Sequence, residues 1–187
     1  MIAIKRPVDR GYVTSIFGDA RADHIHQGID IAAPKGTPVK ALSDGIVAAT
    51  YLSGDLDRYG NTIVVKHNAE TYTLYAHLDQ MLVSKGQKIA AGTPIATVGD
   101  TAGTRDNPAA TGAVHLHFET LTRWPPTEKH SDRRDPLKIL AALGLIRGTT
   151  IPNGATPLAP TTTKGSATIA ALLFLVALGS MFLTSRQ

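Results

Sequence analysis

Four histidines and one aspartate have the residue types and the spacing of a hydrolytic metal centre. His26 and Asp30 lie four residues apart, His115 and His117 lie two apart, and His77 stands between these pairs in the chain. Neutral imidazoles and a carboxylate suit Zn²⁺, and catalytic zinc sites take three protein ligands and keep a fourth position for water. Bound zinc lowers the pKa of water to about 7 and polarises a carbonyl group. The five side chains therefore predict metal-assisted hydrolysis.

The pair His115 and His117 suits a site if it lies on a β-strand. Side chains of a strand alternate between its two faces, so these histidines would share one face, about 6.5–7 Å apart at the backbone. Leu116 and Phe118 would then point the other way, into a core. Only one of the two histidines needs to bind the metal. Two histidines on a half-exposed strand face also occur without a catalytic role, so this pair alone does not define a site.

The pair His26 and Asp30 is equally weak alone. Gly28 between them permits a tight backbone path, and the isoleucines on either side of Asp30 would anchor the opposite face of a strand. Asp30 is otherwise compatible with a turn or a helix cap. His24 is a poorer ligand candidate than His26, because no glycine and aspartate follow it at the matching spacing. The strength of the prediction lies in the combination of the two pairs.

The elements that must hold these residues are predicted to be short β-strands. Runs of β-branched and aromatic residues, separated by turn-forming residues, continue to about residue 120. Strands are predicted over residues 12–17, 46–51, 62–67, 71–76, 88–89, 94–98 and 114–121, with a hairpin turn at 68–70. This pattern is typical of an antiparallel β-sandwich or open barrel, so the predicted fold class is mainly β. One helix is predicted over 135–144, between the capping Asp135 and the terminating Gly144.

Composition narrows the range of functions. The chain of 187 residues has no cysteine, which excludes disulfides and thiolate metal ligands. Its net charge is +4 with neutral histidines, but no dense block of lysine and arginine occurs, so the sequence does not favour nucleic-acid binding. The N-terminus shows no apolar segment of the kind expected in a secretory signal.

The C-terminal part has a different composition. Residues 147–165 are rich in Thr, Pro, Ala and Gly and predict a flexible linker. Residues 167–183 are almost wholly apolar, and the segment 166–187 that contains them predicts a single transmembrane helix, because about 17–25 residues cross a bilayer. Lys164 and Arg186 flank this span without setting its orientation. We therefore expect a folded domain over 1–146, a linker and a membrane anchor; a buried helix in an oligomeric assembly is the alternative for the last segment.

Several ordered motifs resemble those of the lysostaphin-type (LytM-like) zinc endopeptidases, which cut peptide bonds in bacterial peptidoglycan. The resemblance covers residues from about 10 to 140. Its motifs are Phe17-Gly18, His26-Gln27-Gly28-Ile29-Asp30, Gly36-Thr37-Pro38-Val39, Tyr59-Gly60-Asn61, Tyr75-Ala76-His77-Leu78 and His115-Leu116-His117-Phe118-Glu119. The resemblance implies the lysostaphin-like fold, a duplicated hybrid motif, and one Zn²⁺ ion as cofactor.

The resemblance also implies a role for each residue of the centre. His26, Asp30 and His117 would ligate the zinc ion. His77 and His115 would be catalytic and act on the water and on the scissile carbonyl, as base or as electrophile, in a division of labour that stays open.

Three further residues are candidates around this centre. Glu119 shares the predicted strand face of His117 and would support that ligand, or else is an exposed carboxylate. Asn61 is a candidate for substrate binding, although a hairpin-turn residue needs no such role. Arg105 is the second candidate, for a carboxylate of the stem peptide. It lies in the stretch 99–114, which is longer than the usual loop of the family, whereas segment 19–23 is shorter than usual.

Three functions fit these features. An active peptidoglycan endopeptidase is favoured over a non-catalytic wall-binding or activator module, because such modules typically lack the metal ligands that this chain keeps. A carrier domain related to lipoyl or biotinyl domains is disfavoured, because no Met-Lys pair occurs. The apolar C-terminal segment suggests a bacteriophage lysin anchored in the virion, with virion proteins as partners and a role in genome entry. A bacterial inner-membrane protein facing the periplasm is the alternative.

Overall fold

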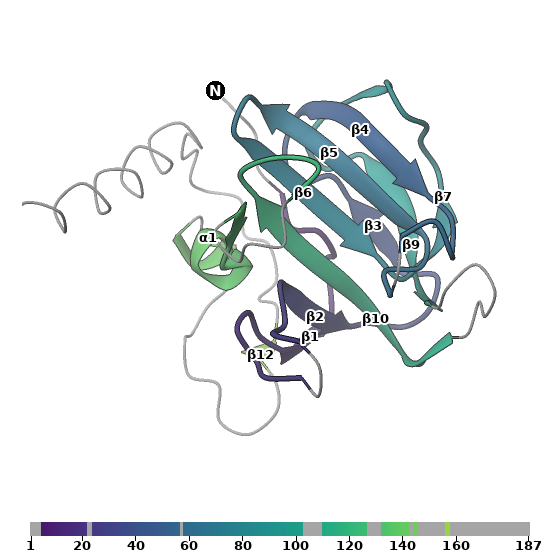
Figure 1. The fold of residues 1–187 in the computed structure, drawn as a ribbon, viewed down its shortest axis with the longest axis vertical. Helices are drawn as coiled ribbons and strands as arrows, with labels where there is room; N and C mark the ends of the chain where they lie inside the picture. The colour runs from purple at the N-terminus through teal and green to yellow at the C-terminus, as the bar shows by residue number, and fades with distance from the viewer. Residues whose placement is uncertain are drawn as a thin grey trace, which may run out of the picture.

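Short strands make up most of the folded chain. The computed structural model describes residues 5–21, 24–56, 58–102, 110–126, 132–142, 144–145 and 156–157. The strands are β1 (Tyr12–Ser15), β2 (Ile29–Ala32), β3 (Pro38–Lys40), β4 (Gly45–Tyr51), β5 (Thr62–Asn68), β6 (Thr71–Ala76), β7 (Leu78–Met81), β8 (Lys88–Ile89), β9 (Pro94–Thr101), β10 (Ala110–Leu121), β11 (Arg133–Arg134) and β12 (Thr156–Pro157). The helix α1 (Pro136–Ala142) lies beside the sheet (Figure 1).

Most strands join one open antiparallel sheet. Its order is β12-β1-β2-β10-β6-β5-β4-β8, and the two end strands do not pair with each other. Strand β9 branches from β10 and pairs with β3 and β7, which form a smaller second layer behind the main sheet in Figure 1. The predicted mainly β, antiparallel class is confirmed, in the form of an open sheet.

The main hydrophobic core fills the space between these two layers. Leu116 and Phe118 of β10 are fully buried in it, together with Ile95 and Val98 of β9. His117 and Glu119 alternate with them and lie on the other face of β10, as the predicted strand periodicity requires. A second, smaller hydrophobic cluster covers that other face, over β4, β5, β6 and β10. The candidate metal centre therefore lies on the sheet face that turns away from the main core.

Several predicted boundaries change in the structure, most of all at the start of β10. The strand predicted over 114–121 begins at Ala110, where it pairs with Thr101 of β9 across an irregular register, so part of the expected loop 99–114 is strand. The helix is confirmed inside 135–144. An oxygen of Asp135 accepts the N–H of Leu137 at 2.9 Å, and Gly144 follows the last turn at a φ of 65°.

Some predictions concern the C-terminal part. The predicted span 166–187 lies outside the described residues, and so does the linker 147–165 except for β12, which pairs with β1. Within the described ranges, no helix has the length and apolar character needed to span a membrane. The division into domain, linker and anchor stays a prediction.

Candidate metal centre

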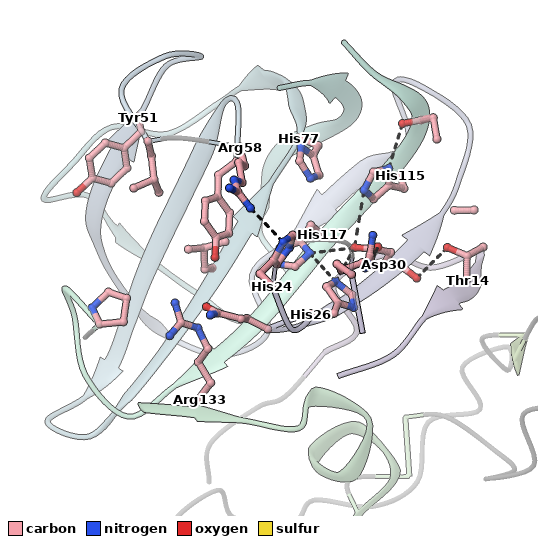
Figure 2. A pocket seen from close by; sticks show the side chains of 18 of the residues that line it. Thr14, His24, His26, Asp30, Tyr51, Arg58, His77, His115, His117 and Arg133 are labelled. Carbon is pink, nitrogen blue, oxygen red and sulfur yellow. Dashed lines mark hydrogen bonds and ion pairs between the residues drawn. The ribbon is translucent and has the colours of Figure 1, made fainter. Parts of the chain in front are cut away.

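Three ligand candidates converge because two neighbouring strands bring them into register. Asp30 of β2 lies directly opposite His117 of β10 in the antiparallel ladder, and His26 precedes β2 on the same side. The Asp30 Oδ1 atom lies 3.1 Å from His26 Nε2 and 2.9 Å from His117 Nδ1. The two histidine nitrogens are 3.1 Å apart. All three residues are buried, and among the described residues they form the group whose spacing suits a metal ion (Figure 2).

Gly28 explains the spacing between His26 and Asp30. Its backbone passes so close to β10 that a Cβ atom there would lie 2.4 Å from the carbonyl oxygen of Phe118 and 2.9 Å from Cγ of Glu119. Any larger residue would push the segment away from β10. Glycine at this position therefore lets the segment that carries His26 and Asp30 lie close to His117 of β10.

Hydrogen bonds outside the centre engage the outer nitrogen of each histidine ligand candidate. His26 Nδ1 donates to the carbonyl oxygen of Ile16 at 2.7 Å, and His117 Nε2 donates to Glu119 Oε1 at 3.0 Å. With a metal bound, each ring would be neutral and carry its one N–H on the outer nitrogen, so His26 Nε2 and His117 Nδ1 would present lone pairs inward, beside an oxygen of Asp30.

Three acceptor atoms about 3 Å apart repel one another unless a proton or a metal ion lies between them. Tetrahedral zinc with bonds of about 2.0–2.1 Å spaces its ligand atoms about 3.3 Å apart, within a few tenths of an ångström of the distances here. The donor set of two imidazoles and one carboxylate also suits zinc. The residues therefore fit this ion.

The carboxylate of Asp30 is held from both sides. Its Oδ2 atom accepts a hydrogen bond from Arg21 at 2.7 Å, which leaves Oδ1 for the centre. Burial alone would raise the pKa of Asp30, but hydrogen bonds to His117 and His26 outweigh it and hold that pKa far below its ordinary value. Asp30 is therefore an anion at neutral pH.

Glu119 is fully buried behind His117, so the alternative of an exposed carboxylate is wrong. Besides the bond from His117, it accepts one from the Tyr59 hydroxyl at 2.6 Å and one from Arg133 Nε at 3.1 Å. Burial would raise the pKa of Glu119, but these three donors lower it. Burial likewise favours a lower pKa for His117, yet its bonds to Asp30 and Glu119 raise that pKa to about 9.

His77 and His115 lie next to each other beside the centre. His77 lies between β6 and β7 with a φ of 58°, and its Nδ1 donates to the carbonyl oxygen of Thr101 at 2.7 Å. His115 Nδ1 donates to the carbonyl oxygen of Ala113 at 3.0 Å, and its Nε2 lies 3.7 Å from Asp30 Oδ1. The two ring centroids are 4.6 Å apart. Both rings therefore turn an unprotonated Nε2 toward the cleft.

Burial keeps both of these histidines neutral. It lowers the pKa of His77 to about 3, with help from the neighbouring His117 and His115. Burial also lowers the pKa of His115, although the charge of Asp30 opposes the shift. Neutral rings with free lone pairs are able to accept a proton or orient a water molecule.

The remaining sequence candidates lie elsewhere. Asn61 Nδ2 donates to the carbonyl oxygen of Leu78 at 3.1 Å, and its Oδ1 accepts the N–H of Ser53 at 3.0 Å. Both polar atoms of its side chain are therefore hydrogen-bonded to the backbone. The contact of Asn61 with substrate stays a prediction, and the backbone hydrogen bonds of its side chain do not support it. Arg105 lies outside the described residues. His24 is exposed, and its Nδ1 lies 3.0 Å from Arg58 on the rim of the cleft.

The centre opens into a cleft of about 880 Å³. Besides the histidines and Asp30, its lining includes Arg21, Tyr59, Trp124 and Arg133, which sequence reasoning did not assign to the site (Figure 2). Tyr59 belongs to the Tyr-Gly-Asn motif, which offered a signal for it. Nothing in the sequence near Arg133 indicates that it contacts Glu119.

An open antiparallel sheet carrying a two-histidine, one-aspartate centre defines a metallopeptidase-type domain. The model of peptidase family M23 matches residues 24–132, more than half of the chain, and the chain belongs to this family. M23 peptidases are zinc-dependent and act on peptidoglycan, and the family includes both endopeptidases and murein hydrolase activators.

Curated relatives share about two fifths of their aligned residues with this chain. The uncharacterized lipoprotein YgeR of Escherichia coli (strain K12) is 40% identical over 123 residues, 66% of this chain and 42% of YgeR. The murein hydrolase activator NlpD of the same strain is 40% identical over 109 residues, 58% of this chain and 26% of NlpD. The peptidoglycan DD-endopeptidase ShyB of Vibrio cholerae is 38% identical over 130 residues, 65% of this chain and 28% of ShyB. The chain thus spans less than half the length of these relatives.

Solved structures show the same fold. The catalytic domain of lysostaphin from Staphylococcus simulans aligns with a TM-score of 0.55 and 27% identity, over 72% of this chain and 92% of that domain. A zinc-containing peptidase from Vibrio cholerae aligns with a TM-score of 0.55 and 34% identity, over 69% of this chain and 37% of the other. The resemblance to the lysostaphin-type endopeptidases is confirmed.

Proposed function

We propose that this protein is a zinc-dependent endopeptidase that hydrolyses peptide cross-links of bacterial peptidoglycan. The observation that carries the proposal is the convergence of His26 Nε2, Asp30 Oδ1 and His117 Nδ1 at 2.9–3.1 Å, a donor set that suits zinc. His77 and His115 stand beside them with a further lone pair each. A structural or wall-binding role requires none of these arrangements.

The residues of the chain divide the chemistry between them. When zinc is bound by His26, Asp30 and His117, it supplies Lewis acidity toward a carbonyl and an acidified water. The Nε2 atoms of His77 and His115 lie on the cleft side, where they accept the proton of the nucleophile or bond to the developing oxyanion after protonation. A base with a low pKa accepts a proton poorly, and the pKa of His77 is about 3. We therefore assign the proton to His115 and the orienting role to His77.

A non-catalytic activator of the same family is the second candidate, because the chain is 40% identical to the activator NlpD over 109 residues. The complete donor set favours the enzyme. So do the outer hydrogen bonds of His26 and His117, which leave the inner nitrogen of each ring for a metal ion. Glu119 adds to this, since a buried carboxylate that fixes the ring of His117 serves a metal ligand and has no use in a mere binding surface.

Digestion of purified sacculi separates the two candidates. The detergent-solubilised full chain is incubated with sacculi, with and without a chelator, and the released fragments are identified by mass analysis. We expect chelator-sensitive release of uncross-linked fragments and no release by the His115→Ala variant. Cleavage between D-alanine and diaminopimelate is our first expectation and cleavage of glycine bridges the second. Zinc-loaded protein that releases nothing from either wall type would favour the activator.

The C-terminal part is proposed to anchor the domain. Residues 1–146 form the peptidase domain, 147–165 the linker and 166–187 the membrane helix, since the last segment is apolar and flanked by Lys164 and Arg186. We propose a virion-associated lysin of a phage that opens the wall during genome entry, with the bacterial inner membrane as the alternative location. Detection of the chain in purified virions tests the first, and loss of membrane association on deletion of 166–187 tests the anchor.

A further inference from the structure

The cleft of the metal centre continues into an uncharged end. Tyr51, the last residue of β4, and Trp124, which follows β10, line this end together with Leu56, Pro125 and Pro126. We call these five residues the aromatic end. The rings of Tyr51 and Trp124 lie 6.0 Å apart between centroids, at a tilt of 56°. In Figure 2, Tyr51 stands across the cleft from Asp30 and Thr14.

Each of the two aromatic rings combines an apolar face with one polar group, the hydroxyl of Tyr51 or the indole N–H of Trp124. Both rings are only half buried and pack against the second hydrophobic cluster. Among the described residues, no hydrogen bond involves the Tyr51 hydroxyl or the Trp124 indole N–H, and neither atom is sealed from solvent. Aromatic rings with free polar tips suit a ligand that is apolar on its face and carries hydroxyl or amide groups at its edge.

A pyranose ring has this shape, because its C–H bonds cover the two faces and its hydroxyl groups project from the edge. The distribution of charged residues in the cleft also favours a neutral sugar at the aromatic end. The lining of the cleft includes the cations Arg21 and Arg58, which suit the carboxylates of a stem peptide. A third lining cation, Arg133, pairs with the buried Glu119, and the five residues of the aromatic end carry no charge. A neutral sugar and an anionic peptide would therefore occupy different parts of one cleft.

The floor of the cleft is continuous between these parts. Tyr59 belongs to the same hydrophobic cluster as Tyr51 and Trp124, and its ring lies 5.5 Å from that of His117 between centroids. A ligand that spans the cleft would thus contact the aromatic end and the metal centre at once. Peptidoglycan is such a ligand, since each stem peptide is attached to a sugar of the glycan strand.

We propose that the aromatic end is a glycan subsite, which binds a hexosamine ring of the strand and thereby positions the attached peptide at the metal centre. This proposal rests on the proposed function for its choice of polymer. Its test does not rest on hydrolysis, because glycan strands stripped of their peptides contain no bond that an endopeptidase cuts.

The only tryptophan of the chain, Trp124, reports directly on this subsite. The zinc-loaded full chain is titrated with peptide-free glycan strands and, separately, with free stem peptides, while tryptophan fluorescence is recorded. We expect saturable change with glycan strands and little change with stem peptides. The Tyr51→Ala variant should bind glycan about five- to tenfold more weakly. Leu52→Ala is the matched control, since Leu52 is the next residue, is 61% exposed and lies outside the cleft lining.

A second measurement separates positioning from folding. The Tyr51→Ala and Trp124→Leu variants should lower kcat/KM on sacculi about fivefold, mainly through KM, and leave kcat/KM on glycan-free cross-linked peptide dimers unchanged. Equal losses on both substrates, or a fluorescence response to stem peptides alone, would overturn the glycan subsite. Glycan binding without hydrolysis of any wall type would instead support the subsite and contradict the proposed enzyme.

Discussion

Glu119 accepts a hydrogen bond from His117 Nε2 at 3.0 Å, and no part of Glu119 reaches solvent. Through this bond a residue that never faces the cleft decides which nitrogen of His117 would be left for a metal ion. Tyr59 and Arg133 hold the carboxylate in turn, at 2.6 and 3.1 Å. The lone pair that His117 directs toward Asp30 is thus prepared by three residues behind it.

Replacing Glu119 should therefore weaken metal binding. In Glu119→Gln the amide N–H groups oppose the donors of His117, Tyr59 and Arg133, so the ring of His117 loses its fixed orientation. We expect zinc affinity to fall about 10- to 100-fold. Competition with a chromophoric chelator measures the change. Glu70→Gln, in an exposed turn, is the control and should leave affinity unaltered.

The five residues of the centre should separate into two classes. Alanine at His26, Asp30 or His117 is expected to abolish stoichiometric zinc binding. Alanine at His77 or His115 should retain zinc but lower kcat by about 10²- to 10⁴-fold, because those rings act on protons and not on the metal.

His24 tests the choice of ligand within its own segment. His24→Ala should keep one zinc ion per chain, as measured by elemental analysis of dialysed protein. If His24→Ala lost the ion while His26→Ala kept it, the assignment of the first ligand would be wrong.

Zinc binding should release a proton. Without metal, the pKa of His117 is raised to about 9, so the centre holds one proton at pH 7.5 that zinc must displace. Titration calorimetry in two buffers of different ionisation enthalpy should report about one proton released at pH 7.5 and almost none above pH 10. A release that did not depend on pH would contradict the raised pKa.

The same shift makes the stability of the metal-free protein depend on pH. The folded state keeps the proton of His117 above the ordinary histidine pKa of about 6.5, where the unfolded chain has lost it. This contribution to stability is complete below about pH 6.5 and is lost as the pH rises through about 9. Thermal melts of metal-free protein should show a lower Tm at pH 9.5 than at pH 6.5, and the drop should shrink in His117→Ala.

Gly28→Ala should impair the fold and the centre together. Its Cβ would approach the carbonyl oxygen of Phe118 to 2.4 Å, so β2 must move away from β10 or the segment must rebuild. We expect a lower Tm and weaker zinc binding in the same variant. A comparison of its Tm with and without saturating zinc separates the two effects, because excess metal restores only the part that reflects lost affinity.

The sequence predicts the strands and the centre to the extent that local patterns encode them. Alternation around His115 and His117 correctly placed Leu116 and Phe118 in the core, and the hairpin at 68–70 is confirmed by the pairing of Asn68 with Thr71. Strands β3, β7 and β11, of two to four residues, escaped prediction because pairing with distant partners, and not local propensity, makes them strands.

Contacts between distant residues could not be predicted in the same way. The bond from Arg133 to Glu119 depends on the chain returning along β10 after residue 121, and the packing of Trp124 on Tyr51 depends on where the loop after β10 lies. No periodicity carries such information. For the same reason, the sequence could not decide whether Glu119 is exposed or supports His117, and the structure shows that it is buried.

Strand β10 presents His115, His117 and Glu119 on one face and core residues on the other, at alternate positions. A slip of its pairing by a single residue would exchange these sets, and leucine and phenylalanine would stand where the imidazoles are. Substitutions that alter the strands are therefore expected to impair both folding and catalysis. Changes in substrate preference are therefore expected in the loops around the sheet, such as the loop that carries Trp124. These loops can change without altering the pairing of β10 with its neighbours.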